Sequence, residues 1–576
     1  MWILGIWSLS VWISQPWGDF PLNDDWSYAI AVKRWLDTGA YIPTPWTSMT
    51  LISHVFWGGL FCKVLGFSFN VLRLSTWVAG IGIICMVYFY CHAVSQDRFI
   101  SRIATLSLAF NPLFFNLSLN FMTDITAMFF NMATIGFMIH YLLHRSDGAL
   151  VLSAIGCIAS LLVRQNGLFL PIAFLLACLV IHPFSFKNLI KSAFPLVTSW
   201  GALHQFEMWM DRTGRTPSLY GLQIHAFQDM CQRLKDHFWT TSGWMIENIA
   251  SQLIEIGVFL LPFSLLGGFC LFRKAKIVPA TMISGCICLT VGFLTAFAFL
   301  IQGKTFPLIG NILHKGGIGP LTLHDTYILG FHHYRQLPPS LWKLVTAFGG
   351  FGMGTLLWII FESVRTLTIH FKNRSFNLFD GIPVFIYACL LVYMIPLSLI
   401  PSFDRYLILP IALLCITIAS DQSQSRLLGH ASSRKYVLMV AVPLLLLQGI
   451  YAVGGTHDYF SWNRARWKLI QDAVGSGIPP SNIDAGFEFN GLVFYGDTFQ
   501  GGEKKDSTKP PIQRNHPRSW WWVTNDEYLV AFGSISNTQI LKTESFTRWL
   551  PFSMGKLFFL KRNEIDGAGD SQRLAD

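Results

Sequence analysis

Apolar runs of membrane-spanning length recur along most of this chain, and they constrain its fold more than any other feature. A helix needs about 20 apolar residues to cross the hydrocarbon core, where no water can satisfy the backbone. Hydrophobic residues make up 52% of the 576 residues, charged residues 13%, and the mean hydropathy is +0.45. We therefore expect an α-helical polytopic membrane protein.

The runs predict about 13 transmembrane helices, with an uncertainty of one or two because several runs are shorter than a full span. They are Met1–Trp17, Val71–Ala93, Ile103–Leu119, Ile125–Leu143, Ala149–Val163, Gly167–Ile181, Ala193–Phe206, Leu253–Phe272, Ile277–Ile301, Leu341–Phe361, Phe379–Ile400, Tyr406–Ser420 and Tyr436–Gly454.

Basic residues gather in alternate loops, which predicts the orientation in the membrane. Cytoplasmic loops carry an excess of Lys and Arg, so these loops are expected inside. This places the N-terminus inside, and Asp24, Asp25 and the C-terminal segment outside, in a multi-pass protein of the inner (plasma) membrane. The clusters are Arg98 and Arg102; Arg145; Lys187 and Lys191; Arg273, Lys274 and Lys276; Arg365, Lys372 and Arg374; and Arg426, Arg434 and Lys435.

Two adjacent carboxylates, Asp24 and Asp25, follow the first apolar run. Apolar residues then recur at helical spacing: Ala29, Ile30, Val32, Trp35 and Leu36. This pattern predicts a short amphipathic helix in the outer interface that ends at Gly39. Because Asp is favoured at helix N-termini, the acid pair either caps this helix or carries chemistry.

Further charged residues are expected at the outer ends of the spans. Asp124 opens the fourth span and is either an N-cap or a functional carboxylate. Arg164 is either a phosphate ligand, which the guanidinium fork suits, or an anchor that reaches water. The segment PSFDRYLILP adds Arg405 and Tyr406 to the same outer rim.

Two outer segments interrupt or follow the spans. Gln302–Ser340 is a long loop with five potential ligands, His314, His324, Asp325, His332 and His333, but without helical metal-binding spacing. It is interpreted as a lid or acceptor-binding loop. From residue 455 the chain becomes more polar, and the strand-like runs NIDAGFEFNGLVFYG, SWWWVTNDEYLVAFG and KLFFLKR predict a small α/β domain. We expect a transmembrane domain over 1–454 and an extracytoplasmic α/β domain over 455–576.

The order of these features resembles the C-class membrane glycosyltransferases, which include protein O-mannosyltransferases and lipid A aminoarabinose transferases. DDWSYAIAVKRWLDTGAY is similar to the family pattern acid-acid-x-x-Tyr, a short helix, then Gly and an aromatic residue. Asp124 falls at a second acidic position, and FDRYLILP resembles the Arg-Tyr that opens a late span. Asp25 departs from the pattern, since many members carry Glu there.

The resemblance implies a hexosyl- or pentosyltransferase with a polyprenyl-phosphate sugar as donor and a lipid, glycan or protein as acceptor. It suggests Asp24, Asp25 and Asp124 as catalytic residues. Arg164, Arg405 and Tyr406 are then expected at the donor phosphate. Inversion at the anomeric carbon is expected. No nucleic acid is implied.

Three alternatives concern a metal ion, a transporter and a polysaccharide enzyme. Mg²⁺ or Mn²⁺ could bind the adjacent acids, but one pair supplies too few ligands for a site. A transporter or flippase would also carry membrane acids, although no symmetry between the two halves supports one. A surface-polysaccharide ligase or polymerase would have its site in Gln302–Ser340.

Overall fold

The computed structural model describes residues 2–373, 375, 378–420, 431–495 and 526–563. The sequence expectations for Arg374, Arg426 and part of the strand-like tail fall outside these residues. The chain forms two compact units, one of Met1–Pro320 and Leu337–His457, the other of Leu321–Gln336 and Asp458–Asp576. The predicted division at residues 454/455 remains a prediction, and the second unit also takes 321–336 from the long loop.

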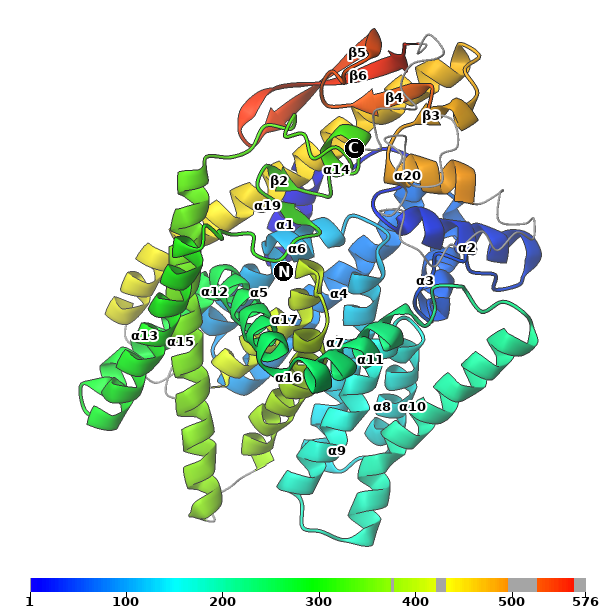
Figure 1. Cartoon of the computed structure of the whole chain (residues 1–576). Coiled ribbons are helices and arrows are strands. Elements are labelled where there is room, and N and C mark those ends of the chain that lie inside the picture. The colour runs from blue at the N-terminus through cyan, green and yellow to red at the C-terminus, as the bar shows by residue number, and fades with distance from the viewer. Residues whose placement is uncertain (1, 374, 376–377, 421–430, 496–525, 564–576) are drawn as a thin grey trace. The chain divides into compact units, whose positions relative to one another are not determined.

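The first unit is almost entirely helical (Figure 1). Its helices are α1 (Trp2–Ile13), α2 (Asp25–Thr38), α3 (Ile52–Leu65), α4 (Phe69–Ser95), α5 (Arg98–Ala109), α6 (Pro112–Leu117), α7 (Thr123–His144), α8 (Asp147–Leu161), η1 (Gln165–Leu168), α9 (Phe169–Ile181), α10 (Phe186–Arg212), α11 (Leu222–Asp236), α12 (Phe238–Ala275), α13 (Pro279–Ile301), α15 (Pro339–Lys372), η2 (Leu378–Asp380), α16 (Gly381–Leu399), η3 (Asp404–Leu407), α17 (Ile408–Ala419) and the start of α19 (Ala431–Gly475). One short hairpin, β1 (Leu313–His314) with β2 (Gly317–Ile318), interrupts them.

Seven helices in the described residues are long and apolar enough to cross a membrane: α4, α7, α12, α13, α15, α16 and the part of α19 from Arg434. A mostly helical, multi-pass architecture is therefore confirmed. The count of 13 spans is not confirmed, because α1, α8 and α9 are apolar but shorter than 18 residues. Helix α3 is a further short apolar helix that the list of runs did not include.

The run Ile103–Leu119 is not one helix, and its sequence explains the break. Helix α5 ends at Ala109, and Asn111 caps α6, where its side chain accepts hydrogen bonds from the N–H groups of Leu113 and Phe114 at 2.9 and 3.1 Å. Pro112 occupies the first position of α6, where its missing N–H is tolerated. An Asn-Pro pair therefore divides this apolar stretch into two short helices.

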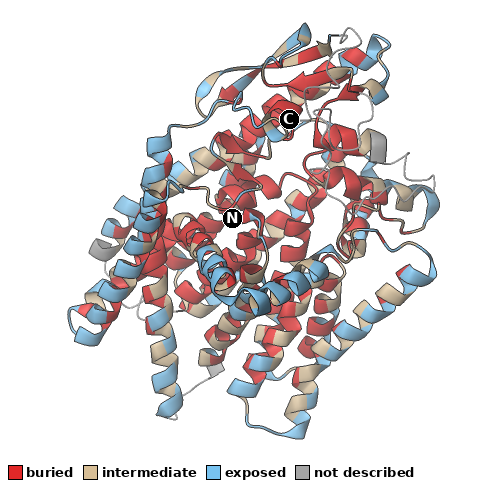
Figure 2. Cartoon of the chain, viewed as in Figure 1, coloured by how far each residue is buried: buried red, intermediate tan, exposed pale blue. Residues whose placement is uncertain are grey.

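Burial is uneven across the first unit (Figure 2). Every residue of α17 is buried, and it packs against α4, α5 and α12. In contrast, α13 exposes one face along its length, including Ile283, Ile287 and Leu294. Exposed apolar faces are expected where a helix meets lipid, so α17 is a core helix and α13 a peripheral one.

Helices α12, α13 and α15 run side by side, and glycines allow their close approach (Figure 1). A Cβ atom at Gly257 of α12 would lie 2.5 Å from both the carbonyl oxygen of Gly349 and the N of Met353 in α15. Small residues let membrane helices pack backbone to backbone. The sequence AFGGFGMG of α15 therefore provides a packing surface rather than a flexible hinge.

The second unit contains a four-stranded sheet in the order β3-β4-β6-β5. Its strands are β3 (Ile483–Asp484), β4 (Tyr528–Ala531), β5 (Thr538–Trp549) and β6 (Phe552–Arg562), with α14 (His324–Tyr327), η4 (Pro480–Asn482), α20 (Phe487–Asn490) and η5 (Gly491–Tyr495) as its short helices. β3 pairs parallel to β4, and the other pairs are antiparallel. Strand β5 was not predicted. The stretch after Ala485 was expected to be extended, but Gly486 (φ +91°) turns the chain and α20 follows.

Candidate active site

Asp24 precedes α2, but its side chain makes no capping hydrogen bond. Its Oδ1 accepts a hydrogen bond from the indole Nε1 of Trp46 at 3.0 Å. Its Oδ2 lies 3.6 Å from Nη1 of Arg405, and the Asp24 side chain stays 19% exposed. The carboxylate therefore faces a tryptophan and an arginine rather than the helix end, and the capping interpretation does not describe its contacts.

Asp25, the neighbouring acid, is fully buried and bound by backbone. Its Oδ1 accepts from the N–H of Leu22, and its Oδ2 from the N–H of Phe121 at 3.4 Å. These contacts join the start of α2 to the segment that leads into α7. Helix α2 ends at Gly39 (φ +70°), as expected from the sequence.

Arg405 lies in η3 and is 5% exposed. Its Nε and Nη1 atoms are buried without a hydrogen-bond partner among the described residues. Its guanidinium also lies 5.0 Å from the ring centroid of Phe403 and 5.6 Å from that of Tyr406. Burying a cation with unused donors is unfavourable unless an anion satisfies them.

The preceding residue, Asp404, fixes the position of η3. Its carboxylate accepts hydrogen bonds from the N–H groups of Ile312 (3.0 Å), Leu313 (2.7 Å) and Arg405 (2.7 Å). Burial raises the pKa of Asp404 to about 7, while these N–H donors act in the opposite direction. The hairpin β1–β2 is thereby tied to the segment that carries Arg405.

Asp124 and Arg164 form the second ion pair of this region, with Nη1 to Oδ1 at 2.7 Å and both side chains buried. Asp124 opens α7, and Arg164 lies between α8 and η1. The guanidinium of Arg164 lies 4.9 Å from the Tyr406 ring centroid. Tyr406 is thus in cation–π contact with both arginines, and Tyr393 donates a hydrogen bond to its carbonyl oxygen at 3.1 Å.

The structure brings the sequence-predicted residues together within the first unit. Asp24 contacts Arg405, Arg405 contacts Tyr406, and Tyr406 contacts Arg164, which pairs with Asp124. Only Asp25 faces away, toward backbone donors. A small cavity lies among Asp124, Arg164, Tyr393, Arg405 and Tyr406, with Asn131 and Asn166 also at its wall.

Tyr28 belongs to this cluster but was not predicted as a site residue. It is 2% exposed and interacts electrostatically with all four charged groups, Asp24, Arg405, Arg164 and Asp124. Burial, aided by Asp24, raises the pKa of its hydroxyl well above 10, so Tyr28 stays protonated and can donate a hydrogen bond. The sequence signal for Tyr28 was its position as the Tyr of the acid-acid-x-x-Tyr pattern, DDWSY. A Tyr at helical spacing otherwise resembles a core residue.

The acids do not form a metal site among the described residues, where no group of three or more His, Cys, Asp or Glu side chains is placed to hold an ion. Asp25 faces backbone N–H donors, and Asp24 faces an indole N–H and a guanidinium. These neighbours are hydrogen-bond donors and do not suit a divalent cation, which requires several oxygen ligands.

Residues 53–209 match the family described as dolichyl-phosphate-mannose-protein mannosyltransferase. The resemblance to the C-class membrane glycosyltransferases is confirmed. The matched segment contains Asp124 and Arg164, whereas Asp24 and Arg405 lie outside it. No curated protein sequence matches the chain. The family match supports a membrane glycosyltransferase without identifying the sugar.

Three solved structures are similar to this chain. ArnT from Cupriavidus metallidurans in the apo state has 13% identity, covers 85% of this chain and 84% of its own, and gives a TM-score of 0.38. The same protein bound to undecaprenyl phosphate has 12% identity, covers 85% of this chain and 84% of its own, and gives a TM-score of 0.36. A third structure is the oligosaccharyltransferase AglB from Archaeoglobus fulgidus in complex with an inhibitory peptide and a dolichol-phosphate. It has 15% identity, covers 83% of this chain and 59% of its own, and gives a TM-score of 0.37. Similarity at this level does not assign residues or ligands in this chain.

Proposed function

We propose that this protein transfers a sugar from a polyprenyl-phosphate donor to an acceptor on the outer face of the membrane. The observation that carries the proposal is the buried guanidinium of Arg405, which has unused donors and lies 3.6 Å from the Asp24 carboxylate. Phosphate oxygens match such donors in charge and geometry. The family description, which includes a dolichyl phosphate sugar, supports the same class of donor.

Donor binding would change the contacts of Asp24. The donor phosphate and the Asp24 carboxylate are both anions that the Arg405 guanidinium can bind. The 3.6 Å between Asp24 Oδ2 and Arg405 Nη1 is longer than a hydrogen bond. A phosphate with more negative charge competes well for the guanidinium. Asp24 then loses part of its electrostatic contact with Arg405, and its carboxylate is free to accept the acceptor's proton.

In the proposed step the acceptor gains the sugar and the polyprenyl phosphate leaves. Asp24 accepts the proton of the acceptor hydroxyl or amide, and the freed electron pair forms the bond to the anomeric carbon. The bond from that carbon to the phosphate oxygen breaks, and its electrons stay on the leaving polyprenyl phosphate. Arg405 and Arg164 stabilise the developing phosphate charge, and Tyr28 can donate a hydrogen bond nearby. A direct displacement inverts the anomeric configuration.

The other acids have supporting roles in this proposal. Asp25 positions α2 and therefore Asp24, because both of its oxygens bind backbone N–H groups. Asp124 orients Arg164 through the 2.7 Å ion pair. Tyr406 contacts both guanidinium groups, and all three side chains line the cavity.

The direct test incubates the purified protein with polyprenyl-phosphate hexoses and pentoses, together with lipid, glycan or peptide acceptors. Mass spectrometry of released polyprenyl phosphate and of the glycosylated acceptor measures the reaction. Release that depends on acceptor and on Asp24 supports transfer. Movement of intact polyprenyl-phosphate sugar across a proteoliposome membrane, without release, would instead identify a flippase.

The outer location of the site rests on the predicted orientation. A reporter that is active only in the cytoplasm, fused after residue 460, is expected to stay silent. Activity of that reporter would place the 455–576 region in the cytoplasm and the site on the inner face.

A further inference from the structure

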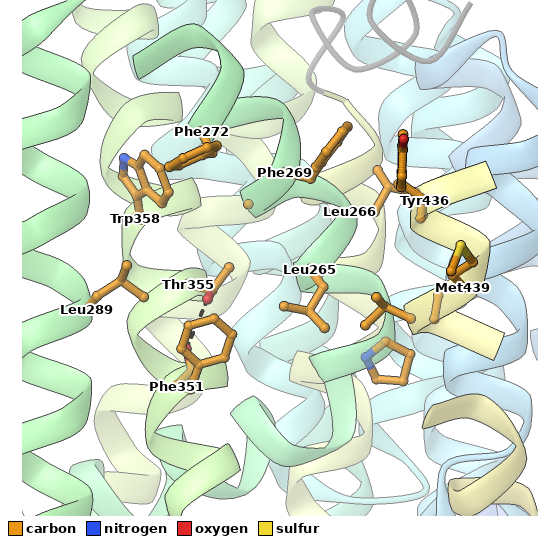
Figure 3. A pocket seen from close by; sticks show the side chains of 15 residues that line it. Leu265, Leu266, Phe269, Phe272, Leu289, Phe351, Thr355, Trp358, Tyr436 and Met439 are labelled. Carbon is orange, nitrogen blue, oxygen red and sulfur yellow. Dashed lines mark hydrogen bonds between the residues drawn. The ribbon is translucent and has the colours of Figure 1, made fainter. Parts of the chain in front are cut away.

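An apolar groove lies between α12, α13, α15 and α19, apart from the charged cluster described above (Figure 3). Its volume is about 450 Å³. Leu265 and Phe269 of α12, Phe351 of α15 and Met439 of α19 point toward it in Figure 3. Met439 is 63% exposed, so the groove opens at the surface of the first unit. An apolar, open groove between membrane helices suits a hydrocarbon chain.

Two cations make cation–π contacts with aromatic rings that line this groove. The guanidinium of Arg273 lies 5.0 Å from the ring centroid of Phe269, and Nζ of Lys276 lies 5.3 Å from that of Phe272. Both rings line the groove. Among the described residues neither cation forms a hydrogen bond or ion pair. Lys274 differs, since it pairs with the buried Glu362 at 3.5 Å.

The two cations lie at the C-terminal end of α12, whereas the proposed active site lies level with the middle of that helix. Glu255 of α12 interacts electrostatically with Asp404, the neighbour of Arg405. Arg273 comes 18 residues later in the same helix, which at 1.5 Å per residue is a distance of about 27 Å along its axis. The hydrocarbon core is about 30 Å thick. A headgroup bound at Arg273 would therefore belong to the other leaflet than the donor phosphate.

We propose that this groove binds an anionic phospholipid of the leaflet on the Arg273 side. One acyl chain fills the apolar groove, and the headgroup phosphate contacts Arg273 and Lys276. Basic pockets between membrane helices bind anionic headgroups in this way. If the two cations served only to orient the protein in the membrane, no preference among lipids would arise at this place.

The test measures lipids retained by the full-length protein, using native mass spectrometry after purification in detergent. Phosphatidylglycerol and phosphatidylcholine with identical acyl chains are titrated, so that only the headgroup charge differs. The expected result is preferential retention of phosphatidylglycerol by the wild type. In the variant Arg273→Gln/Lys276→Gln, that affinity should fall by about thirtyfold, from the loss of two cations. Phosphatidylcholine binding should change little.

Matched variants separate a specific site from general effects. Arg145→Gln/Lys187→Gln removes two cations elsewhere, and Arg145 also stacks on a ring, 5.4 Å from Tyr141. It should leave phosphatidylglycerol binding unchanged. Leu265→Trp fills the groove and should weaken binding of both lipids, whereas Leu294→Trp on the exposed face of α13 should not.

Three results would overturn the proposal: equal retention of the two lipids by the wild type, unchanged binding in Arg273→Gln/Lys276→Gln, or equal loss in the Arg145 and Lys187 control. A polyprenyl phosphate added as competitor provides a further check. If it displaces phosphatidylglycerol and loses affinity in the same variant, the groove belongs to the donor lipid and the assigned occupant is wrong.

Discussion

Nη1 of Arg405 lies 3.6 Å from Oδ2 of Asp24, which joins the entrance of α17 to the start of α2. The two residues come from opposite ends of the first unit's sequence. Arg405 is buried while Asp24 keeps partial exposure, so the carboxylate is the accessible member of the pair. An acceptor that approaches from solvent would meet Asp24, and a buried phosphate would meet Arg405.

Replacement of Asp24 by Asn tests the proposed base. Asn retains the size of the side chain and can still accept a hydrogen bond from Trp46, so the fold should persist. Transfer should fall by about 10²- to 10⁴-fold, because the amide cannot accept the acceptor's proton. Single-turnover kinetics with a saturating donor measures this. Asp37→Asn, which changes an exposed acid of the same helix, should have no effect. A wild-type rate in Asp24→Asn would exclude Asp24 as the base.

Replacement of Arg405 tests the phosphate contact. Arg405→Leu should lower kcat by about 10²- to 10³-fold, comparable with the removal of one donor to a developing anion. Arg405→Lys should be intermediate, because the charge remains but the fork is lost. Steady-state kinetics over a range of donor concentrations provides the measurement. Arg215→Leu serves as control, since the Arg215 side chain donates a hydrogen bond to the Tyr41 carbonyl oxygen at 3.4 Å and is not part of the charged cluster. Equal activity of Arg405→Leu and wild type would remove Arg405 from the mechanism.

The buried pair of Arg164 and Asp124 should be coupled in stability. Arg164→Met leaves the Asp124 carboxylate buried without its cation, and should lower the free energy of unfolding by about 3–5 kcal/mol. The double variant Arg164→Met/Asp124→Leu should recover most of this loss, although it should remain inactive. Denaturant unfolding of wild type, Arg164→Met, Asp124→Leu and the double variant in one detergent gives the coupling energy. Additive effects of the two changes would mean that the ion pair contributes no coupling.

The sequence predicted the helical membrane architecture and most residues of the candidate site, because both follow from local patterns. Apolar runs determine helices, and charged residues at the ends of such runs are conspicuous. The partners of those residues depend on tertiary packing. Nothing in the sequence indicates that Asp24 faces Trp46 and Arg405 while Asp25 faces the backbone of Phe121.

Other differences have local causes. The break between α5 and α6 could have been predicted from Asn111-Pro112, but the apolar residues around that pair masked it. Tyr28 was overlooked because its burial among four charged groups appears only in the folded chain. Strand β5 is mostly exposed and has no sustained alternation of polar and apolar residues, so its pairing with β6 rather than an internal pattern defines it.

Replacing glycine by alanine should change the free energy of unfolding in opposite directions at a packed site in α12 and an open site in α10. Gly257→Ala places a methyl group against backbone atoms at 2.5 Å, which cannot move aside without separating the helices. It should destabilise the protein by about 1–3 kcal/mol. Gly201→Ala in α10 meets no atom within 4 Å and should stabilise the helix by up to about 1 kcal/mol. Thermal unfolding in detergent compares them. Stabilisation by Gly257→Ala would contradict the close approach.

Asp404 should make the stability of the first unit depend on pH. Burial raises its pKa from 3.8 to about 7, although the N–H groups of Leu313, Ile312 and Arg405 oppose this. The folded protein therefore holds the proton more tightly than the unfolded chain. The resulting stabilisation is complete below about pH 4 and is lost as the pH rises to about 7, by at most about 4 kcal/mol.

The measurement is the unfolding free energy of wild type and Asp404→Asn between pH 4 and pH 8. Wild-type stability should decline across this range, and Asp404→Asn should lose that part of the decline because its side chain does not titrate. Asp37→Asn, an exposed control, should keep the wild-type slope. If the slopes of wild type and Asp404→Asn agree, the three backbone donors hold Asp404 ionised throughout. In that case a charged Asp404 carboxylate connects the hairpin to η3, and this anion stays bound to the backbone N–H of Arg405 at every pH tested.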